Sequence, residues 1–320
     1  MSSDCPVAKL PKCRIAGFLV VAMDASIGLV RALLPTTVAL RVQIPSDHRS
    51  VAVLGDERMG SAVMVEPGVA LTVTYVVMGG REIRATFPDG ESCEAEILAQ
   101  DFESGLAALR LPRRAGAAAA LGDSRALRKG QDVFVLGSTG ATERRVSNGV
   151  VTDLGPFDAY WEYMLESAIQ SSAINPGFGG GPLFDNRGRL LGITSLNLGQ
   201  VGRFSLAVPI HLFADHRQDL LRFGHVQGRT RRAWVGIYAE LTGTGVVVSG
   251  LVPDGPAARA GVREGDVIAA VNFAEVATRE EMYRHLWQRS AGSVVRLGVV
   301  RKSERLVIEV LSMDRAEFYR

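Results

Sequence analysis

The chain has 320 residues, 47% of them hydrophobic and 22% charged, which is typical of a globular protein with room for two or three cores. Its net charge of +2 gives no indication of nucleic acid or an anionic membrane as a partner. Three cysteines without CxxC spacing and five histidines without metal-ligand spacing argue against a disulfide framework and a zinc site. We therefore expect no cofactor and no metal.

The N-terminal segment contains the apolar run IAGFLVVAM, which stops at Asp24. It is too short for a transmembrane helix, which needs about 20 apolar residues. It has the length of the hydrophobic part of a signal peptide, but no clear cleavage site follows. We interpret residues 1–23 as a leader or extra segment, and we predict a helix from an N-cap at Asp24 to Pro35.

Short strands separated by glycine turns follow, from Thr36 to about Ile210. Before the alanine-rich connector at 113–120 the predicted strands are TTVALRVQI, GSAVMV, VALTVTYVV, EIRATF, CEAEILAQ and LAALRL. After it they are DVFVLGS, VSNGVVTDL, MLESAI, LLGITSL and SLAVPI. Two runs of strands on either side of a connector predict two β-barrels. The stretch HLFADHRQDLLRFG then predicts a closing helix, with Gly224 just past its end.

A smaller module follows a polar linker, in which we interpret the arginine cluster RTRRAW as solvated. Its predicted strands are WVGIYAEL, GVVVSGLV, DVIAAVN, VVRLGVV and RLVIEVLS, and its predicted helices are PAARAG and TREEMYRHLWQ. Thr278 and Glu281 form a capping-box pattern on the second helix. The predicted divisions are two barrels at 24–215, a linker at 216–230, an α+β module at 231–313 and a tail at 314–320.

Six stretches in the right order resemble the HtrA/DegP family of serine proteases. They are GSAVMV, LTVTYVV, AQDFESGLAALRL, LGDSRALRKGQDVFVLGSTG with VSNGVVTDL, AINPGFGGGPLFDNRGRLLGITS, and SLAVPI. The resemblance covers nearly all of residues 24–313. It implies a mostly β fold, a trypsin-like double β-barrel followed by a small α+β PDZ domain.

The resemblance also implies three catalytic positions, at which this chain has other residues. The family's histidine falls at Tyr75, its aspartate at Gly105 and its serine at Gly179. A serine nucleophile needs an adjacent base, and the base needs an orienting group; glycine supplies neither. Tyrosine, with a reference pKa near ~10, is a weak base at neutral pH. We therefore predict no catalytic residues and a chain that is not an enzyme, an inactive homologue or pseudoprotease.

Relocated catalysis is the alternative. Ser171 and Ser172 lie near the nucleophile loop, but no histidine lies near them in the sequence. His48 is on the approach to the first barrel, and we interpret Cys93 in its strand as a buried structural thiol. Isolated residues of this kind are weak signals, so we do not expect relocated catalysis.

The glycine-rich loop GFGGGPL has two interpretations. Glycines permit tight turns with positive φ, which is sufficient reason for them in a barrel loop. Alternatively, the backbone N–H groups form a vestigial oxyanion loop that cups a carbonyl or an anion. Its residues would be Gly177, Phe178 and Gly179. We favour the turn.

A PDZ domain adds an extended peptide to a sheet edge and holds its terminal carboxylate in a nest of backbone N–H groups. The resemblance places that nest at Trp234, Val235, Gly236 and Ile237. The helix over 278–288 would form the other wall, with Met282, Tyr283 and Leu286 as candidate lining residues, although some must belong to the core.

Three functions stay open. The first is a non-catalytic HtrA-like protein that binds peptides or proteins as adaptor, chaperone or assembly factor. The others are a constitutive subunit of a larger protein complex and an active HtrA-type serine endopeptidase. The resemblance implies protein or peptide C-termini as partners, is compatible with a homo-oligomer or larger assembly, and suggests a periplasmic or membrane-associated location. Nothing in the sequence names the partner.

Overall fold

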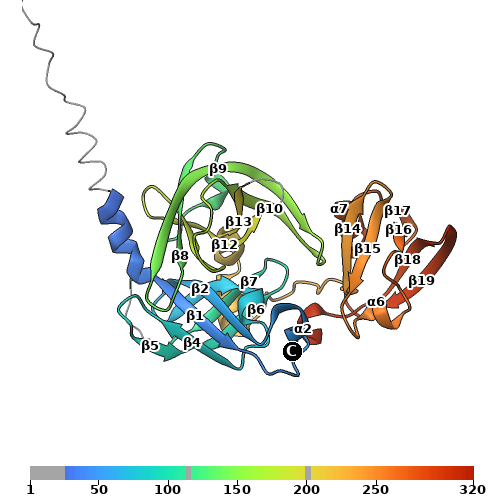
Figure 1. Cartoon of the computed structure of the whole chain (residues 1–320), viewed down its shortest axis with the longest axis horizontal. Helices are drawn as coiled ribbons and strands as arrows, with labels where there is room; N and C mark the ends of the chain where they lie inside the picture. Colours follow the sequence, from blue (N-terminus) through green and yellow to red (C-terminus); the bar gives the residue numbers. More distant parts are fainter. Residues whose placement is uncertain (1–25, 113–116, 199–202) are drawn as a thin grey trace, which may run out of the picture.

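The computed structural model describes residues 26–112, 117–198 and 203–320 (Figure 1). Residues 26–33 are helical, and a short 3-10 turn, η1 (Leu34–Thr36), leads into the first strand. The predicted leader, residues 1–23, and the N-cap predicted at Asp24 for the following helix lie outside the described residues. Within the described ranges, no helix is both long enough and apolar enough to cross a membrane.

The first barrel is a seven-stranded antiparallel sheet with strand order β5-β4-β1-β2-β3-β7-β6. Its strands are β1 (Thr37–Gln43), β2 (Glu57–Glu66), β3 (Val69–Val73), β4 (Glu82–Thr86), β5 (Ser92–Glu94), β6 (Glu96–Asp101) and β7 (Leu106–Arg110). The short helices α2 (Val51–Leu54) and α3 (Thr74–Val77) lie between them.

The predicted strand over 69–77 is wrong in its second half, because β3 ends at Val73 and α3 takes the last four residues. The turn buries Val76 and Val77 in the core. Its end is capped by the buried Arg58, whose Nη1 donates to the carbonyl oxygens of Tyr75 (2.9 Å) and Met78 (2.8 Å). A distant side chain therefore stabilises a helical turn in a β-branched segment that would otherwise favour a strand.

The second barrel is closed, with strand order β10-β13-β12-β11-β8-β9. Its strands are β8 (Asp132–Ser138), β9 (Arg144–Ala159), β10 (Tyr163–Ser171), β11 (Pro182–Asp185), β12 (Leu190–Leu198) and β13 (Phe204–Pro209). Before it lies the 3-10 turn η2 (Ser124–Ala126), and after it come α4 (His211–Ala214) and α5 (Arg217–Phe223). The single closing helix predicted over 211–224 is thus two short helices, but Gly224 ends the second of them with φ 77°, as predicted.

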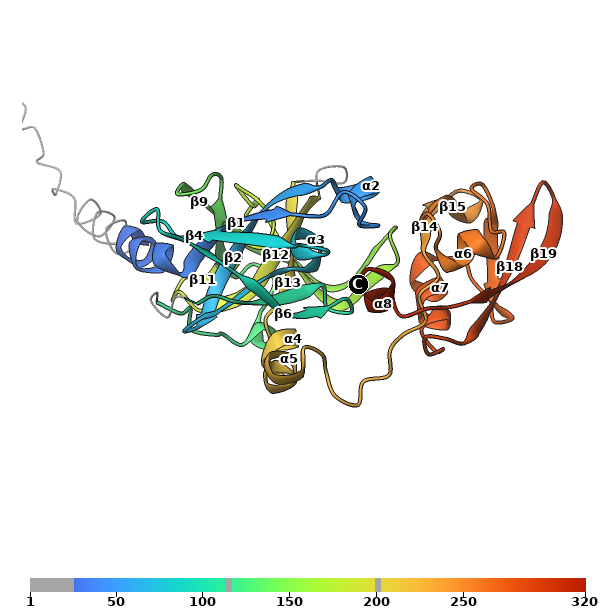
Figure 2. The same ribbon diagram turned by 90° about the horizontal axis from the view of Figure 1, so that it is seen from below.

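The β9–β10 hairpin is longer than the sequence indicated and projects beyond its barrel toward the C-terminal module (Figures 1 and 2). That module is a six-stranded antiparallel sheet, in which β17 pairs with β16 beside the path β14-β15-β16-β18-β19. Its strands are β14 (Ile237–Thr242), β15 (Gly245–Leu251), β16 (Val267–Val271), β17 (Ala274–Glu275), β18 (Val294–Arg301) and β19 (Glu304–Leu311). Its helices are α6 (Pro256–Arg259), α7 (Arg279–Leu286) and α8 (Arg315–Phe318).

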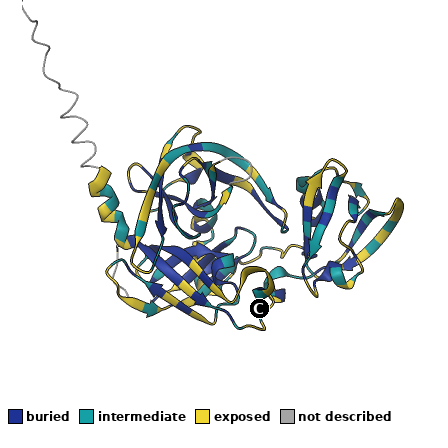
Figure 3. Cartoon of the chain, in the orientation of Figure 1, coloured by how far each residue is buried: buried dark blue, intermediate teal, exposed yellow. Residues whose placement is uncertain are grey.

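The capping box on α7 is confirmed, since Thr278 and Glu281 each bond the other's backbone N–H. Buried residues follow the strands of both barrels and of the C-terminal sheet (Figure 3). One hydrophobic cluster runs through both barrels, and a second fills the C-terminal module. Met164 of β10 belongs to this second cluster, so the hairpin contributes to the core of the neighbouring module.

Candidate peptide-binding site

The three positions aligned with a catalytic triad meet in space, from three different elements. Tyr75 lies on α3, Gly105 in the β6–β7 turn and Gly179 in the loop before β11. The N–H of Thr74 donates to the Gly105 carbonyl (2.8 Å), and Tyr75 Oη donates to the Ser195 carbonyl (2.6 Å). A Cβ atom built on Gly179 would overlap the Tyr75 hydroxyl. The tyrosine therefore fills the space beside residue 179.

A second tyrosine fills the space beside Gly105. This glycine has φ 78°, and a Cβ atom on it would lie 2.7 Å from Tyr163 Oη. Tyr163 Oη donates to the Ser104 carbonyl (2.7 Å). Burial raises the pKa of Tyr75 to about 12 and raises the pKa of Tyr163 further. Both hydroxyls are therefore protonated hydrogen-bond donors at neutral pH.

The loop over 177–179 bonds largely within the chain. Gly177 N–H donates to the Asn175 side chain (3.2 Å), and Phe178 N–H donates to the Ser138 carbonyl (2.9 Å). Two of the three N–H groups considered for an oxyanion loop thus already have partners. The Phe178 carbonyl accepts from Ser61 Oγ (3.0 Å).

Two serine–histidine pairs occur in the described chain, neither of which the sequence suggested. His48 Nδ1 lies 2.7 Å from Ser50 Oγ, and His48 Nε2 lies 3.0 Å from the Tyr319 carbonyl. Ser124 Oγ lies 2.8 Å from His211 Nδ1. Ser50 lines the same pocket as Tyr75, whereas Ser124 does not.

Three other residues considered for relocated catalysis, Ser171, Ser172 and Cys93, lie in or beside strands and pair with neighbouring strands. Ser172 Oγ accepts from the N–H of Val150 (3.0 Å), and Ser171 is buried in β10. Cys93 is half-buried in β5, where it pairs with Ala85.

An apolar pocket of about 320 Å³ lies between the barrels and the C-terminal module. Aromatic side chains from both parts of the chain line it. They include Tyr75, Tyr160, Trp161, Tyr163, Trp234 and Tyr238. The pocket extends from the region of the triad positions to Gly236 and Ile237, where the C-terminal module presents its backbone N–H groups.

Those N–H groups converge on one carboxylate. Glu162 accepts from the N–H of Val235 (3.0 Å to Oε1), Gly236 (2.8 Å to Oε2) and Ile237 (3.3 Å to Oε2). Gly236 has φ 78°, and its Cβ would lie 3.1 Å from the Trp234 ring. Three of the four residues predicted for the nest thus direct their backbone N–H groups at Glu162, whereas the N–H of the fourth, Trp234, donates to the Met313 carbonyl (3.0 Å).

Of the three candidate lining residues on α7, Met282 and Leu286 are buried in the core of the module. Tyr283 contacts the hairpin, because its hydroxyl donates to the Ala159 carbonyl (2.6 Å) and accepts from the Glu162 N–H (3.1 Å). Arg279 also faces the hairpin and pairs with Asp158 (2.5 Å).

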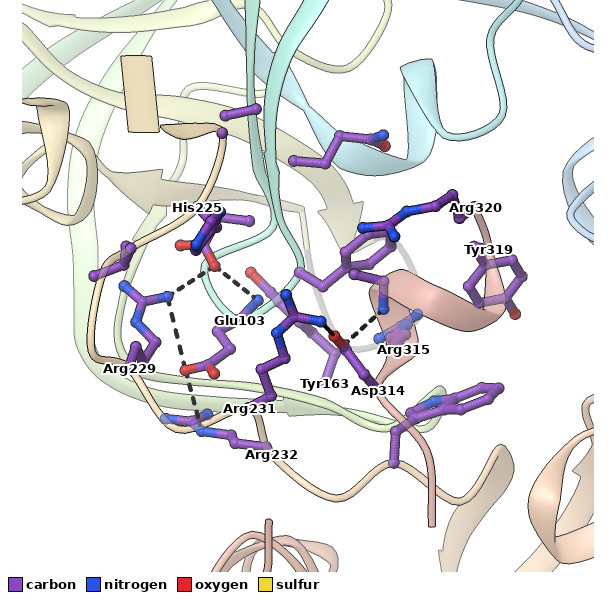
Figure 4. A pocket seen from close by; sticks show the side chains of 18 of the residues that line it. Glu103, Tyr163, His225, Arg229, Arg231, Arg232, Asp314, Arg315, Tyr319 and Arg320 are labelled. Atoms are coloured by element: carbon purple, nitrogen blue, oxygen red, sulfur yellow. Dashed lines mark hydrogen bonds and ion pairs between the residues drawn. The ribbon is translucent and has the colours of Figure 1, made fainter. Parts of the chain in front are cut away.

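A cleft of about 480 Å³ lies on the other side of this junction (Figure 4). Arg229 pairs with Asp101 (2.8 Å), and Arg232 pairs with Glu103 (3.2 Å). Arg231 reaches α8 at Asp314 and Glu317. Burial raises the pKa of the Glu103 carboxyl despite these arginines. Arg231 and Arg232 are exposed, as predicted for a solvated cluster, but both are held in ion pairs, and the following Ala233 and Trp234 are buried.

Sequence reasoning missed Glu162, Asp158 and Arg279. The available signal was YWEY at 160–163, a glutamate between aromatic residues at a hairpin tip. The backbone N–H groups that bind Glu162 lie 73 or more positions away along the chain, and no local sequence pattern predicts such a distant contact.

The fold and site define a trypsin-like peptidase domain followed by a PDZ domain. The family description "Trypsin-like peptidase domain" matches residues 60–193, and "PDZ domain" matches residues 231–311. The chain belongs to the HtrA/DegP-like family, so the predicted resemblance and fold class are confirmed.

Relatives and solved structures agree. A "periplasmic serine endoprotease DegP-like" protein of Halomonas elongata is 31% identical over 275 residues, covering 80% of this chain and 56% of the relative. A protein of that name in Pseudomonas savastanoi pv. phaseolicola is 29% identical over 273 residues, covering 79% and 55%. The structure "HtrA-type protease AlgW with decapeptide" matches with TM-score 0.55 and 25% identity over 91% of this chain and 98% of that one.

These names correct one prediction. The sequence led us to predict that the chain is not an enzyme, and the comparisons contradict this, because the relatives are named serine endoproteases and the structural neighbours are HtrA proteases. The chain spans about half the length of the curated relatives it matches.

Proposed function

We propose that this chain binds the C-terminal segments of other proteins in the groove between β14 and α7. The observation that carries the proposal is the nest at 235–237, where three backbone N–H groups converge on one carboxylate. A peptide C-terminus has the same carboxylate chemistry, and a PDZ groove takes the peptide before it as an added strand. The peptide present in the AlgW structure supports this proposal by analogy.

The test is fluorescence anisotropy with a labelled peptide that copies residues 153–161 and ends in a free carboxylate. The same peptide with an amidated end is the negative probe. We expect Gly236→Asp to weaken binding of the free-acid peptide at least about tenfold, because its carboxylate repels the ligand's. Gly243→Asp is the matched control, since no atom lies within 4 Å of the Cβ position at Gly243. Equal binding of acid and amide would refute the proposal.

The second candidate function is the serine endopeptidase activity that the relatives' names favour. Among the described residues, Ser50 lines the apolar pocket and pairs with His48. Ser50 is 2% exposed and its Oγ also accepts from Arg58 Nη2 (2.5 Å), so this activity requires that Ser50 become exposed when a substrate binds. In this scheme Ser50 Oγ attacks a peptide carbonyl while its proton passes to His48 Nδ1. The proton then passes to the leaving amine, and water releases the acyl group. The Tyr319 carbonyl accepts from His48 Nε2 and would fix the tautomer.

Release of fluorescent fragments from an unfolded, labelled casein tests this activity directly. The scheme predicts that Ser50→Ala lowers the rate by about four orders of magnitude or more. Ser124→Ala, which removes the other serine–histidine pair, should leave the rate unchanged. Cleavage that survives Ser50→Ala would refute Ser50 as nucleophile, and no cleavage by the wild-type chain would refute the activity.

A further inference from the structure

The tip of the β9–β10 hairpin, residues 158–162, lies in the PDZ groove as a bound peptide would. The N–H of Ala239 on β14 donates to the Tyr160 carbonyl (2.8 Å), which is a strand-type bond. Tyr283 on the facing helix α7 closes the other side with its bond to the Ala159 carbonyl (2.6 Å). The tip is therefore held between the two walls of the groove.

The side-chain carboxylate of Glu162 lies where the terminal carboxylate of a peptide bound to a PDZ domain would lie. The residue is only 3% exposed, and its carboxylate accepts from three consecutive backbone N–H groups. The backbone adopts φ 57° at this residue, a conformation that non-glycine residues rarely take. Arg315 on α8 donates to the main-chain carbonyl of Glu162 (3.2 Å), which leaves the carboxylate to the nest.

A packing contact between two domains does not require such an arrangement. Burying a carboxylate is costly unless hydrogen bonds compensate for the lost water, and apolar side chains would join the domains at a smaller cost. The three N–H groups of the nest, of the kind that hold a peptide terminus, offset part of that cost. The carboxylate and the strand-type bond together match the two contacts by which a PDZ groove recognises its ligand.

We propose that the hairpin tip is an internal ligand of the PDZ groove, with Glu162 in the place of a peptide C-terminal carboxylate, so that an incoming C-terminus must displace it. The inference rests on the proposed peptide binding and adds its regulation. The free groove is the binding-competent state, and the apparent affinity for a peptide falls by the fraction of molecules in which the groove is free.

The experiment uses the full chain and the labelled free-acid peptide of residues 153–161. Glu162→Gly removes the carboxylate and is compatible with the positive φ, and Glu162→Ala removes it while keeping a β-carbon. We expect both variants to bind the peptide at least about tenfold more tightly than the wild type. Glu143→Gln, an exposed glutamate just before β9, is the matched control and should bind like the wild type. Thermal unfolding verifies that each variant is folded.

The outcomes separate the two proposals. Tighter, carboxylate-dependent binding by both Glu162 variants supports the internal ligand. Equal, carboxylate-dependent binding by wild type and variants overturns the internal ligand and leaves the proposed function standing. Absence of carboxylate-dependent binding in every folded variant overturns the proposed function itself.

Discussion

At the scale of single residues, two tyrosine hydroxyls occupy the space that side chains at residues 105 and 179 would need. Tyr75 Oη lies where a Cβ on Gly179 would be, and Tyr163 Oη lies 2.7 Å from a Cβ on Gly105. The glycines and the tyrosines are thus sterically matched. The sequence indicated which residues stand at these positions, but it gave no sign of Tyr163, because that match joins residues 58 positions apart.

The match between Gly179 and Tyr75 can be measured. Gly179→Ala should lower the free energy of unfolding by about 1–3 kcal/mol, the usual cost of overpacking a filled site. The cost should fall when Tyr75→Phe removes the hydroxyl, so the two substitutions should couple in a double-mutant cycle. Urea unfolding provides the measurement.

Gly140→Ala is the matched control for this cycle, because its Cβ would meet its nearest neighbour at an ordinary 3.8 Å. It should change the free energy of unfolding by less than about 0.5 kcal/mol. Additive effects of Gly179→Ala and Tyr75→Phe would contradict the steric match.

At the scale of helices and strands, sequence patterns correctly predicted the helix ends that are stabilised by bonds between residues close together in the chain. The capping box of α7 and the αL end of α5 each depend on residues within a few positions of one another, Thr278 with Glu281 and Gly224 with the last turn of α5. The turn α3 did not follow from its own sequence, since Arg58 from β2 caps it. The extension of β9 and the docking of its hairpin likewise depend on a partner in the other domain.

Docking of the hairpin should depend on pH. Burial raises the pKa of Glu162 to about 7, while an exposed glutamate has a pKa of about 4.3. Between these values the docked state binds more protons, so docking weakens as pH rises and the weakening is complete above about pH 7. The terminal carboxylate of the free labelled peptide, with a reference pKa of about 3.5, is ionised throughout this range.

We therefore expect the wild-type chain to bind the labelled peptide at least about tenfold more tightly at pH 8 than at pH 5. The charged side chains that face the tip are Arg315, Arg279 and Asp158, and the Glu166–Arg284 pair joins β10 to α7 beside it. The tyrosines around the tip are Tyr160, Tyr163, Tyr238, Tyr283 and Tyr319. Glu162→Gly should bind with nearly constant affinity across the range, and a wild-type affinity that falls with pH would contradict the prediction.

At the scale of the whole molecule, the last residues tie the PDZ domain back to the first barrel. Phe318 on α8 packs on Trp234 (4.7 Å between ring centroids) and lies beneath the Arg49 guanidinium (4.3 Å). The Tyr319 carbonyl bonds His48 (3.0 Å). The sequence suggested only a tail here, because four helical residues carry no periodic pattern and their stability comes from tertiary contacts.

Removing this tie should loosen the junction. Phe318→Ala deletes a side chain that is 4% exposed, and should lower the free energy of unfolding by about 3 kcal/mol or more. It should also speed tryptic cleavage at the arginines of the linker, 229–232. Phe273→Ala is the matched control, since Phe273 is 75% exposed. An unchanged cleavage rate in Phe318→Ala would show that α8 does not hold the domains together.

The hairpin and the groove belong to one chain, and this sets a threshold for any competitor. A tethered segment faces its site at an effective concentration on the order of millimolar, whatever the concentration of the protein. Dilution or overproduction of the protein therefore leaves the competition unchanged. Under the proposed displacement, a free peptide therefore occupies the groove only when its concentration and affinity together exceed those of the tethered hairpin.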